Sequence, residues 1–344
     1  MKLHEDPNAF RVLIESVHQR TGYRADVLEK DYYIVLMLRE LAGLQAEGLP
    51  AYFKGGTALY KALKTTNRFS EDIDLSVDTR GCSRSQSDKR LDWATKKYRS
   101  LPRDTSAGIN HRSEVITVYT YEPIVSYDEN DALQRFGRLK FEATSFTISE
   151  PVENLEISSM LYDLADDEQR TILQEQYEDV DPFTVKTISM ERIFVDKLFA
   201  AEAYVRKSDE PHRAFEAAKH IYDLTVLFYQ PNIQELMSEE EQMAYLLDIR
   251  LQEEQERLDG IPGVLPPDFH FFTQAGYDPR VRDAYEIMQD QYVLREQDVI
   301  PYDDALLVLR RMQEQLMQNP AWAMGQSSQQ QSETPSFGMQ MGMI

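Results

Sequence analysis

Two stretches near the N-terminus carry apolar residues at the spacing of an amphipathic helix. Residues 7–20 and 24–46 show this pattern, which in "VLEKDYYIVLMLREL" includes Val27, Tyr32 and Leu36. Apolar positions three to four residues apart lie on one face of a helix with 3.6 residues per turn. The pattern therefore predicts two helices that pack against a core.

Short apolar or alternating runs after these helices predict strands. "LPAYF" at 49–53 is a short apolar run, and "DIDLSV" at 72–77 alternates polar with apolar residues. Between them, "TALYKALK" predicts a helix with Thr57 as its N-cap. The segment 84–100 predicts a basic helix. Further strands are predicted at 114–121, 137–147 and 154–161.

After about residue 183 the pattern becomes helical. Helices are predicted at 188–207, 212–229, 239–258 and 302–318. The tail from Asn319 is rich in Gln, Ser, Met and Gly and carries few charges, so we expect it to be disordered. The whole pattern predicts an α+β fold: an α/β domain with a small mixed sheet at 1–182, a helical domain at 183–318 and a disordered tail at 319–344.

Charge is distributed unevenly along the 344 residues. The formal net charge is −22, yet residues 1–150 are neutral overall and residues 151–344 carry the whole excess of negative charge. The block 51–100 has five more basic than acidic residues. An evenly acidic chain would argue against nucleic acid as a partner, but this distribution leaves room for a basic surface.

Cysteine content and the N-terminal segment bear on the expected location. One cysteine, Cys82, excludes an internal disulfide and fits a reducing compartment. The segment "MKLHEDPNAF" lacks the basic and apolar regions of a signal peptide. No apolar run approaches the ~20 residues of a membrane span. We therefore expect a soluble cytoplasmic protein that does not enter a membrane.

Two glycines and two aspartates stand close together in "YFKGGTALYKALKTTNRFSEDIDLSV". Gly55 and Gly56, between a strand and a helix, let the backbone approach a ligand closely, and free amides at a helix N-terminus favour phosphate. Asp72 and Asp74 are two residues apart, so on a strand both carboxylates point to one face. Carboxylate oxygens are preferred by Mg²⁺, which often shares them with nucleotide phosphates. The stretch therefore predicts a magnesium and nucleotide site.

A third carboxylate usually completes such a site from a neighbouring strand. Glu142 in "RLKFEATSF" is best placed, on the same face of its strand as Lys140. Each feature also has a structural explanation: the glycines as a tight turn, the aspartates as a solvated strand end, and Glu142 as an exposed partner of Lys140. The proximity of the glycine pair to the aspartates weakens the first two explanations, and both interpretations of Glu142 stay open.

Four segments resemble the motifs of one known family. "FKGGTALYKALKTTNRFSEDIDL" resembles the opening signature of the AbiEii/AbiGii-type nucleotidyltransferase toxin family, within the polymerase-β-like nucleotidyltransferase superfamily. "EKDYYIVLMLREL", "VKTISMERIFVDKLFA" and "KHIYDLTVL" resemble three further motifs, in the family's order between Glu29 and Leu227. Ile193 stands where the family often has Thr, and Lys219 where Arg is usual. Neither departure removes a carboxylate or the lysine of the third motif.

The resemblance implies roles for further side chains. Lys197 would reach nucleotide phosphates with its ammonium, and the alternative is a lysine that only snorkels out of the core. Asp223 would pair with Lys197 or orient the nucleotide. The expected catalytic residues are Asp72, Asp74, Glu142, Lys197 and Asp223, and the expected metal ligands are Asp72, Asp74 and Glu142. Contacts to the triphosphate are expected from Lys54, Gly55, Gly56, Thr57, Lys61, Arg68 and Ser70.

The resemblance also implies a fold and an activity. A nucleotidyltransferase fold would bind one or two Mg²⁺ and an NTP, and would transfer NMP to an acceptor hydroxyl. In the family the acceptor is often the tRNA 3′ end, and the protein is the toxin of a toxin–antitoxin or phage-defence (abortive infection) system that a DNA-binding antitoxin commonly accompanies. Two alternatives stay open. The acceptor is a protein or a small molecule, or the fold has lost its activity and serves as a binding subunit.

Overall fold

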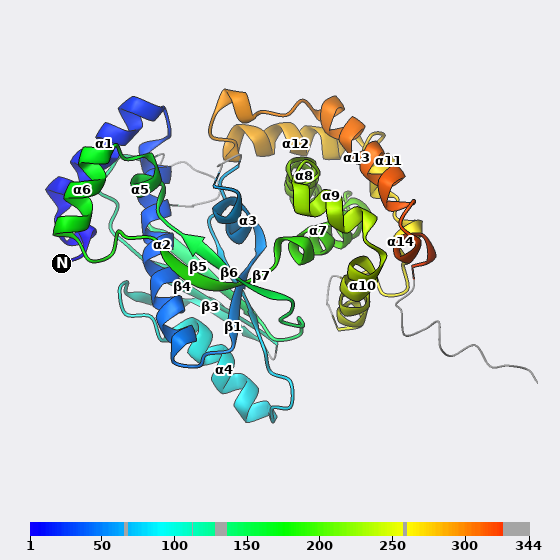
Figure 1. The fold of residues 1–344 in the computed structure, drawn as a ribbon, viewed down its shortest axis with the longest axis horizontal. Helices are drawn as coiled ribbons and strands as arrows, with labels where there is room; N and C mark the ends of the chain where they lie inside the picture. Colours follow the sequence, from blue (N-terminus) through cyan, green and yellow to red (C-terminus); the bar gives the residue numbers. More distant parts are fainter. Residues whose placement is uncertain (65–67, 112, 128–135, 257–259, 326–344) are drawn as a thin grey trace, which may run out of the picture. The chain divides into compact units, whose positions relative to one another are not determined.

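The computed structural model describes residues 1–64, 68–111, 113–127, 136–256 and 260–325 (Figure 1). The chain forms two compact units. The first consists of Met1–Ile193 and Glu286–Ile300, and the second of Phe194–Tyr285 and Pro301–Ile344. Among the described residues, no helix is long and apolar enough to cross a membrane.

The first unit is built on a seven-stranded mixed sheet (Figure 1). The strand order is β3-β4-β5-β2-β1-β7-β6. The pairs β2/β5 and β1/β7 are parallel, and the other neighbours are antiparallel. This arrangement confirms the predicted α+β fold with a mixed sheet. The strands are β1 (Ala51–Lys54), β2 (Ile73–Val77), β3 (Arg103–His111), β4 (Glu114–Thr120), β5 (Arg138–Thr144), β6 (Val152–Ile157) and β7 (Phe183–Ile188).

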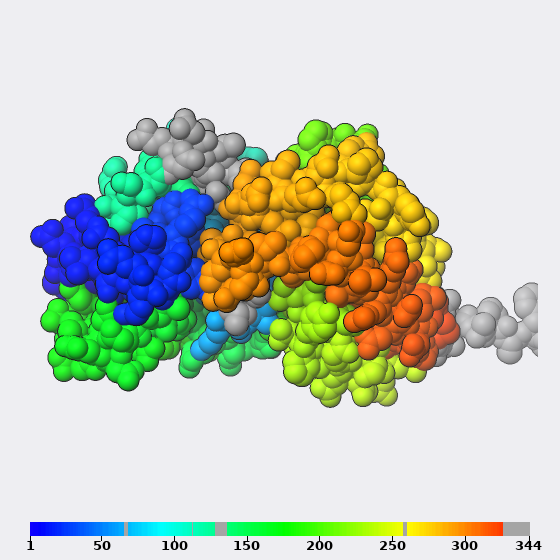
Figure 2. Space-filling view, turned by 90° about the horizontal axis from the view of Figure 1, so that it is seen from above, coloured from blue at the N-terminus to red at the C-terminus, as the bar shows by residue number. Residues whose placement is uncertain are grey.

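Helices pack on this sheet and beside it. Helix α2 packs against β7, and α4 packs against β4, β5 and β2. Helices α1 and α6 lie side by side, as Figures 1 and 2 both show, and Arg20 and Asp166 form an ion pair there at 3.1 Å. The helices of this unit are η1 (Leu3–Glu5), α1 (Pro7–Thr21), α2 (Ala25–Ala46), α3 (Gly55–Leu63), α4 (Arg84–Lys96), α5 (Met160–Leu164), α6 (Asp167–Gln176) and η3 (Glu296–Asp298).

Helix α2 carries three consecutive charged residues that are buried. Glu29 is 1% exposed and accepts hydrogen bonds from the backbone N–H groups of residues 124 and 125. Lys30 forms an ion pair with Glu71, and Asp31 forms one with Lys61. Buried charges are tolerated only when they are paired or hydrogen-bonded. These three residues of the "EKDY" segment therefore fasten α2 to three different parts of the first unit.

The burial of Glu29 predicts a pH dependence of stability. Burial raises the pKa of this carboxyl from 4.5 to about 7, although the two backbone N–H groups oppose the change. The folded state therefore favours the protonated form of Glu29. The contribution of Glu29 to the free energy of unfolding is complete below pH 4.5 and is lost as the pH rises through 7. The loss amounts to about 3 kcal/mol in the free energy of unfolding.

This contribution can be isolated with Glu29→Gln, which stays neutral at every pH. Urea unfolding of the wild type and the variant should be compared between pH 5 and pH 8. We expect the stability of the variant relative to the wild type to increase across this range. Parallel pH profiles for the two proteins would contradict the assignment of this titration to Glu29.

The second unit is helical and has a core of its own. Helix α13 packs against α8, α9 and α11, and α10 packs against α9 and α14. On α13, Leu309, Met312 and Leu316 are fully buried, and each such side chain contributes roughly 1.5–3 kcal/mol of transfer free energy. Helices α7 (Met190–Val205) and α12 (Pro279–Tyr292) belong partly to each unit. The others are α8 (Pro211–Leu227), α9 (Pro231–Ser238), α10 (Glu240–Glu254), η2 (Pro266–Asp268), α11 (Phe271–Gln274), α13 (Tyr302–Leu316) and α14 (Pro320–Met324).

Several observed elements differ from the predicted ones in the first unit. Strand β3 was not predicted, because "RDTSAGINH" lacks apolar alternation and lies exposed at the edge of the sheet. Strand β7 forms where the helical half was expected to begin, since Val185, Thr187 and Ile188 are buried between β1 and β6. The predicted strand 154–161 ends at Ile157, where the chain turns into α5.

The predicted disordered tail also begins differently. The side chain of Asn319 accepts hydrogen bonds from the backbone at the start of α14. Trp322 is 1% exposed and packs edge-on against Phe269. Burial of this indole holds the chain in the second unit beyond the predicted boundary. The rest of the predicted tail, residues 326–344, lies outside the described residues.

Candidate active site

The Gly-Gly turn joins β1 directly to α3. Gly55 has a φ of +80°, a left-handed conformation that glycine adopts without strain. A Cβ atom on Gly55 would lie 2.2 Å from Oδ2 of Asp74, so the backbone of the turn touches this carboxylate. Helix α3 begins at Gly55 with Lys54 at the N-cap. The prediction that Thr57 is the N-cap is therefore wrong, because the helix starts two residues earlier.

Thr57 instead fastens the following loop to the start of α3. Its hydroxyl is hydrogen-bonded to Oγ of Ser70 at 3.0 Å and to the backbone carbonyl of Asp72 at 2.5 Å. A Cβ atom on Gly56 would lie 2.7 Å from Oγ of Ser70 and 3.2 Å from Nη2 of Arg68. The structure therefore brings the glycine pair, a hydroxyl and a guanidinium to one place, and these groups are suited to binding an anion.

A second set of contacts positions the loop between Arg68 and Asp72. Glu71 forms an ion pair with Lys30 at 3.2 Å. It also accepts a hydrogen bond from the hydroxyl of Tyr292 at 3.1 Å. The backbone N–H of Phe69 donates to the carbonyl of Tyr292, and Arg68 forms a β-bridge with Val293. Sequence reasoning missed the contacts with Tyr292 and Val293, because these residues lie more than 200 positions away from the loop in the chain.

The carboxylates meet on neighbouring strands. Asp74 on β2 lies opposite Glu142 on β5 in the parallel register, and Asp72 immediately precedes β2. The ammonium of Lys140 lies 3.3 Å from Oδ2 of Asp72 and 3.0 Å from Oε2 of Glu142. Lys140 thus bridges two of the three predicted metal ligands. Its contact with Glu142 is the pairing that the sequence offered as the structural explanation of Glu142.

The charges of this cluster perturb one another. Burial and the charges of Glu142 and Asp72 together raise the pKa of Asp74 to about 7, although Lys54 and Lys140 oppose the shift. Burial also raises the pKa of Glu114 on β4, and Glu142 adds to this shift. Glu114 is a fourth carboxylate that sequence reasoning missed, because the pairing of β4 with β5 is not visible in the sequence.

The three predicted metal ligands do not form a ready metal site as they stand. Within the described residues, no group of three or more His, Cys, Asp or Glu side chains is arranged to hold a metal ion. Lys140 supplies a physical reason, since its ammonium contacts two of the carboxylates. The donor chemistry still fits a hard cation, because Asp72, Asp74 and Glu142 offer oxygen atoms and repel one another.

Lys197 and Asp223 lie in the second unit and form a buried ion pair. Nζ of Lys197 on α7 lies 2.5 Å from Oδ2 of Asp223 on α8, and both side chains are about 5% exposed. The preceding residue, Asp196, contacts Arg250 on α10 at 3.2 Å. Two successive side chains of α7 therefore reach two different helices. The predicted pairing of Lys197 with Asp223 is observed. The contact of Lys197 with nucleotide phosphates stays a prediction.

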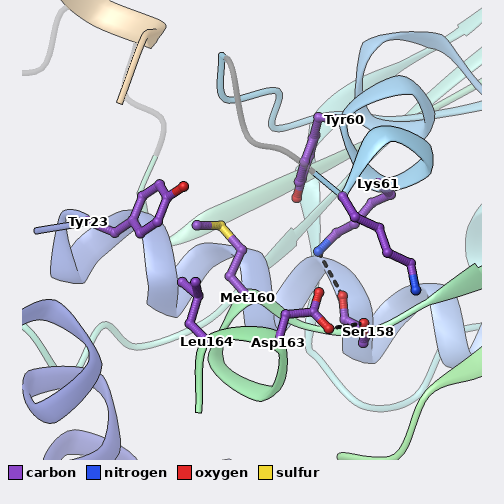
Figure 3. Close-up of a pocket in the computed structure, with 8 residues that line it drawn as sticks. Tyr23, Tyr60, Lys61, Ser158, Met160, Asp163 and Leu164 are labelled. Atoms are coloured by element: carbon purple, nitrogen blue, oxygen red, sulfur yellow. Dashed lines mark hydrogen bonds between the residues drawn. The ribbon is translucent and has the colours of Figure 1, made fainter. Parts of the chain in front are cut away.

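A pocket lies near the far end of α3, beside α5 (Figure 3). Figure 3 shows Lys61 donating to the carbonyl of Ser158 at 3.0 Å, and Ser158 in turn donates from its hydroxyl to Asp163 at 2.5 Å. The ammonium of Lys61 also pairs with Asp31 at 2.5 Å. Lys61 is thus held in the core at the opposite end of α3 from Gly55, and it does not serve the glycine turn as predicted.

A family model matches most of the chain and contains three of the four motifs in full. The family described as "Nucleotidyl transferase AbiEii toxin, Type IV TA system" matches residues 37–309. Curated proteins show no significant match to the chain. Among solved structures, the crystal structure of JHP933 from Helicobacter pylori is similar at 16% sequence identity, with a TM-score of 0.42, and the match covers 86% of this chain and 94% of that chain.

Proposed function

Because the chain belongs to the AbiEii nucleotidyl transferase toxin family of type IV toxin–antitoxin systems, we propose that it transfers NMP from an NTP to the 3′ hydroxyl of a tRNA. The observation that carries this proposal is the contact of the Gly55 turn with Asp74, which lies opposite Glu142 on the neighbouring strand and two residues after Asp72. Membership of a toxin–antitoxin family makes a cognate antitoxin the expected partner.

The first unit supplies groups for each part of the proposed reaction. The N-terminus of α3 at Gly55 and Gly56, with Arg68 and Ser70 beside it, is the proposed cradle of the triphosphate. Mg²⁺ held by Asp72, Asp74 and Glu142 would neutralise the charge that develops on the phosphates. The acceptor oxygen forms a bond to the α-phosphorus as the bond to pyrophosphate breaks, and the hydroxyl proton passes to Glu142 and then to solvent.

Helix α4 supports RNA as the acceptor class. Between Arg84 and Arg99 the chain carries six basic and two acidic residues in a protein with a net charge of −22. Arg84, Lys89, Lys97 and Arg99 are exposed. Exposed lysine and arginine side chains are the usual contacts of nucleic-acid phosphates, and such binding weakens steeply as the salt concentration rises.

Lys197 is the remaining proposed contact to phosphate, with Asp223 as the carboxylate that orients its ammonium. This assignment rests on the third and fourth motifs of the family and on the ion pair between the two residues. A purely structural pair is the competing explanation, and the two are separated by the double variant argued below.

The proposal is tested by following label from nucleotide to acceptor. Purified protein is incubated with total RNA, Mg²⁺ and each α-³²P-labelled NTP in turn, and Asp74→Ala serves as the control for contaminating enzymes. We expect label in tRNA-sized RNA with at least one NTP, and none with the control. Label in protein or small molecules would identify a different acceptor, and absence of both transfer and nucleotide binding would indicate a fold without this activity.

A further inference from the structure

Lys140 occupies the position that a cation would be expected to take. Its ammonium lies 3.3 Å from Oδ2 of Asp72, which immediately precedes β2, and 3.0 Å from Oε2 of Glu142 on β5. The parallel register places Asp74 opposite Glu142, so the same face also carries the third carboxylate. Lys140 thus supplies positive charge to two of the three carboxylates, and Lys54 lies opposite Asp74 in the antiparallel register of β1 with β2.

The pairing is electrostatically favourable but exchangeable. Lysine is an ammonium at neutral pH, and Lys140 is held in place by its ion pairs with Asp72 and Glu142. The Lys140 and Asp72 side chains are each 38% exposed. A lysine head on a flexible four-carbon stem can leave such a site for solvent without disturbing the core.

We propose that Lys140 is the resident counter-ion of the Asp72–Asp74–Glu142 cluster, and that a divalent cation must displace it in order to bind. An ammonium and a divalent cation repel each other strongly when both contact the same oxygen atoms. Lys140 therefore sets the cation affinity of the site and holds the carboxylates in place until the cation arrives. The inference rests on the proposed metal site of the transferase.

The test measures cation binding directly, in the absence of nucleotide and RNA. Mn²⁺ is titrated into the metal-free full-length protein, and free Mn²⁺ is quantified by electron paramagnetic resonance. We expect Lys140→Met to lower the half-saturating Mn²⁺ concentration by about tenfold, because the variant removes the charge that repels the cation. In EDTA the same variant should melt at a lower temperature than the wild type, because the carboxylates lose the ammonium that pairs with them. Addition of Mn²⁺ should raise the melting temperature of the variant by more than it raises that of the wild type.

Two control variants separate displacement from a general change of charge. Lys140→Arg keeps the positive charge and should bind Mn²⁺ like the wild type. Arg138→Met removes a positive charge two residues away on β5, where Arg138 pairs with Asp104 at 3.6 Å. It should also leave Mn²⁺ affinity unchanged. An equal increase in Mn²⁺ affinity in Arg138→Met and Lys140→Met would overturn the proposal. Unchanged or weaker Mn²⁺ binding by Lys140→Met would also overturn it.

Failure of this inference is distinguishable from failure of the proposed function. Mn²⁺ binding that is lost in Asp74→Asn, with no effect of Lys140→Met, overturns the counter-ion role and leaves the metal site standing. Identical Mn²⁺ binding by the wild type and Asp74→Asn overturns both. If Lys140→Met does not fold, Lys140→Gln replaces it, since the amide keeps hydrogen bonding without the charge.

Discussion

Gly55→Ala is expected to lower nucleotidyl transfer by at least about 100-fold while the protein remains folded. The new methyl group would stand 2.2 Å from Oδ2 of Asp74, a distance at which something must move. Asp74 is anchored on β2 between β1 and β5, so its carboxylate turns away while the strand stays. Displacement of a reacting group by about 1 Å commonly lowers activity by two orders of magnitude.

A second glycine in the same unit provides the matched control. Gly81 has a φ of +71°, close to the +80° of Gly55, but a Cβ atom there would meet no atom within 4 Å. Gly81→Ala carries the same backbone strain, about 1–3 kcal/mol, without the clash. We expect both variants to remain folded at the temperature of the assay, and Gly81→Ala to keep its transfer activity within about twofold of the wild type.

The labelled-nucleotide assay and thermal unfolding decide between two outcomes. Loss of transfer in Gly55→Ala alone supports a reaction that requires Asp74 at its observed position. Equal loss in both alanine variants would show that strain in the backbone, and not the clash with Asp74, removes activity. Full transfer by Gly55→Ala would contradict the assignment of Asp74 to the active site.

The sequence pattern predicted the local parts of the first unit well. Periodicity predicted α1 and α2 to within a few residues, alternation predicted β2, and β4 and β5 were also predicted as strands, because these elements bury a regular set of side chains. Strand β3 had no such signal, since its side chains are polar and exposed. The start of helix α14 is visible in the sequence, because Asn319 followed by Pro320 is a typical helix start.

The candidate site was predictable in its chemistry but not in its partners. Spacing alone indicated that Asp72 and Asp74 share a face and that Glu142 suits a neighbouring strand. It could not show that Lys140 bridges to Asp72, because this contact depends on the parallel register of β2 with β5. Nor could it show that Tyr292 supports the loop at Glu71, since pairing across 221 residues leaves no local pattern.

Lys197→Met is expected to lower the free energy of unfolding by roughly 3 kcal/mol or more. The buried carboxylate of Asp223 would lose the ammonium that lies 2.5 Å away, and its charge would remain in a site only about 5% exposed. Urea unfolding of the full chain measures this loss. Lys64→Met is the surface control, because Lys64 and its partner Glu156 have side chains that are 50% and 63% exposed, and such pairs contribute little.

The double variant Lys197→Met/Asp223→Leu separates stability from catalysis. Replacing a buried ion pair with apolar side chains is often neutral or stabilising, so we expect this protein to regain most of the stability that Lys197→Met loses. If Lys197 neutralises phosphate charge, transfer of label stays at least about 100-fold below the wild type although the fold is restored. Recovery of transfer together with stability would show that the pair only joins α7 to α8, and that the phosphate contact inferred from the family motifs is made by another residue.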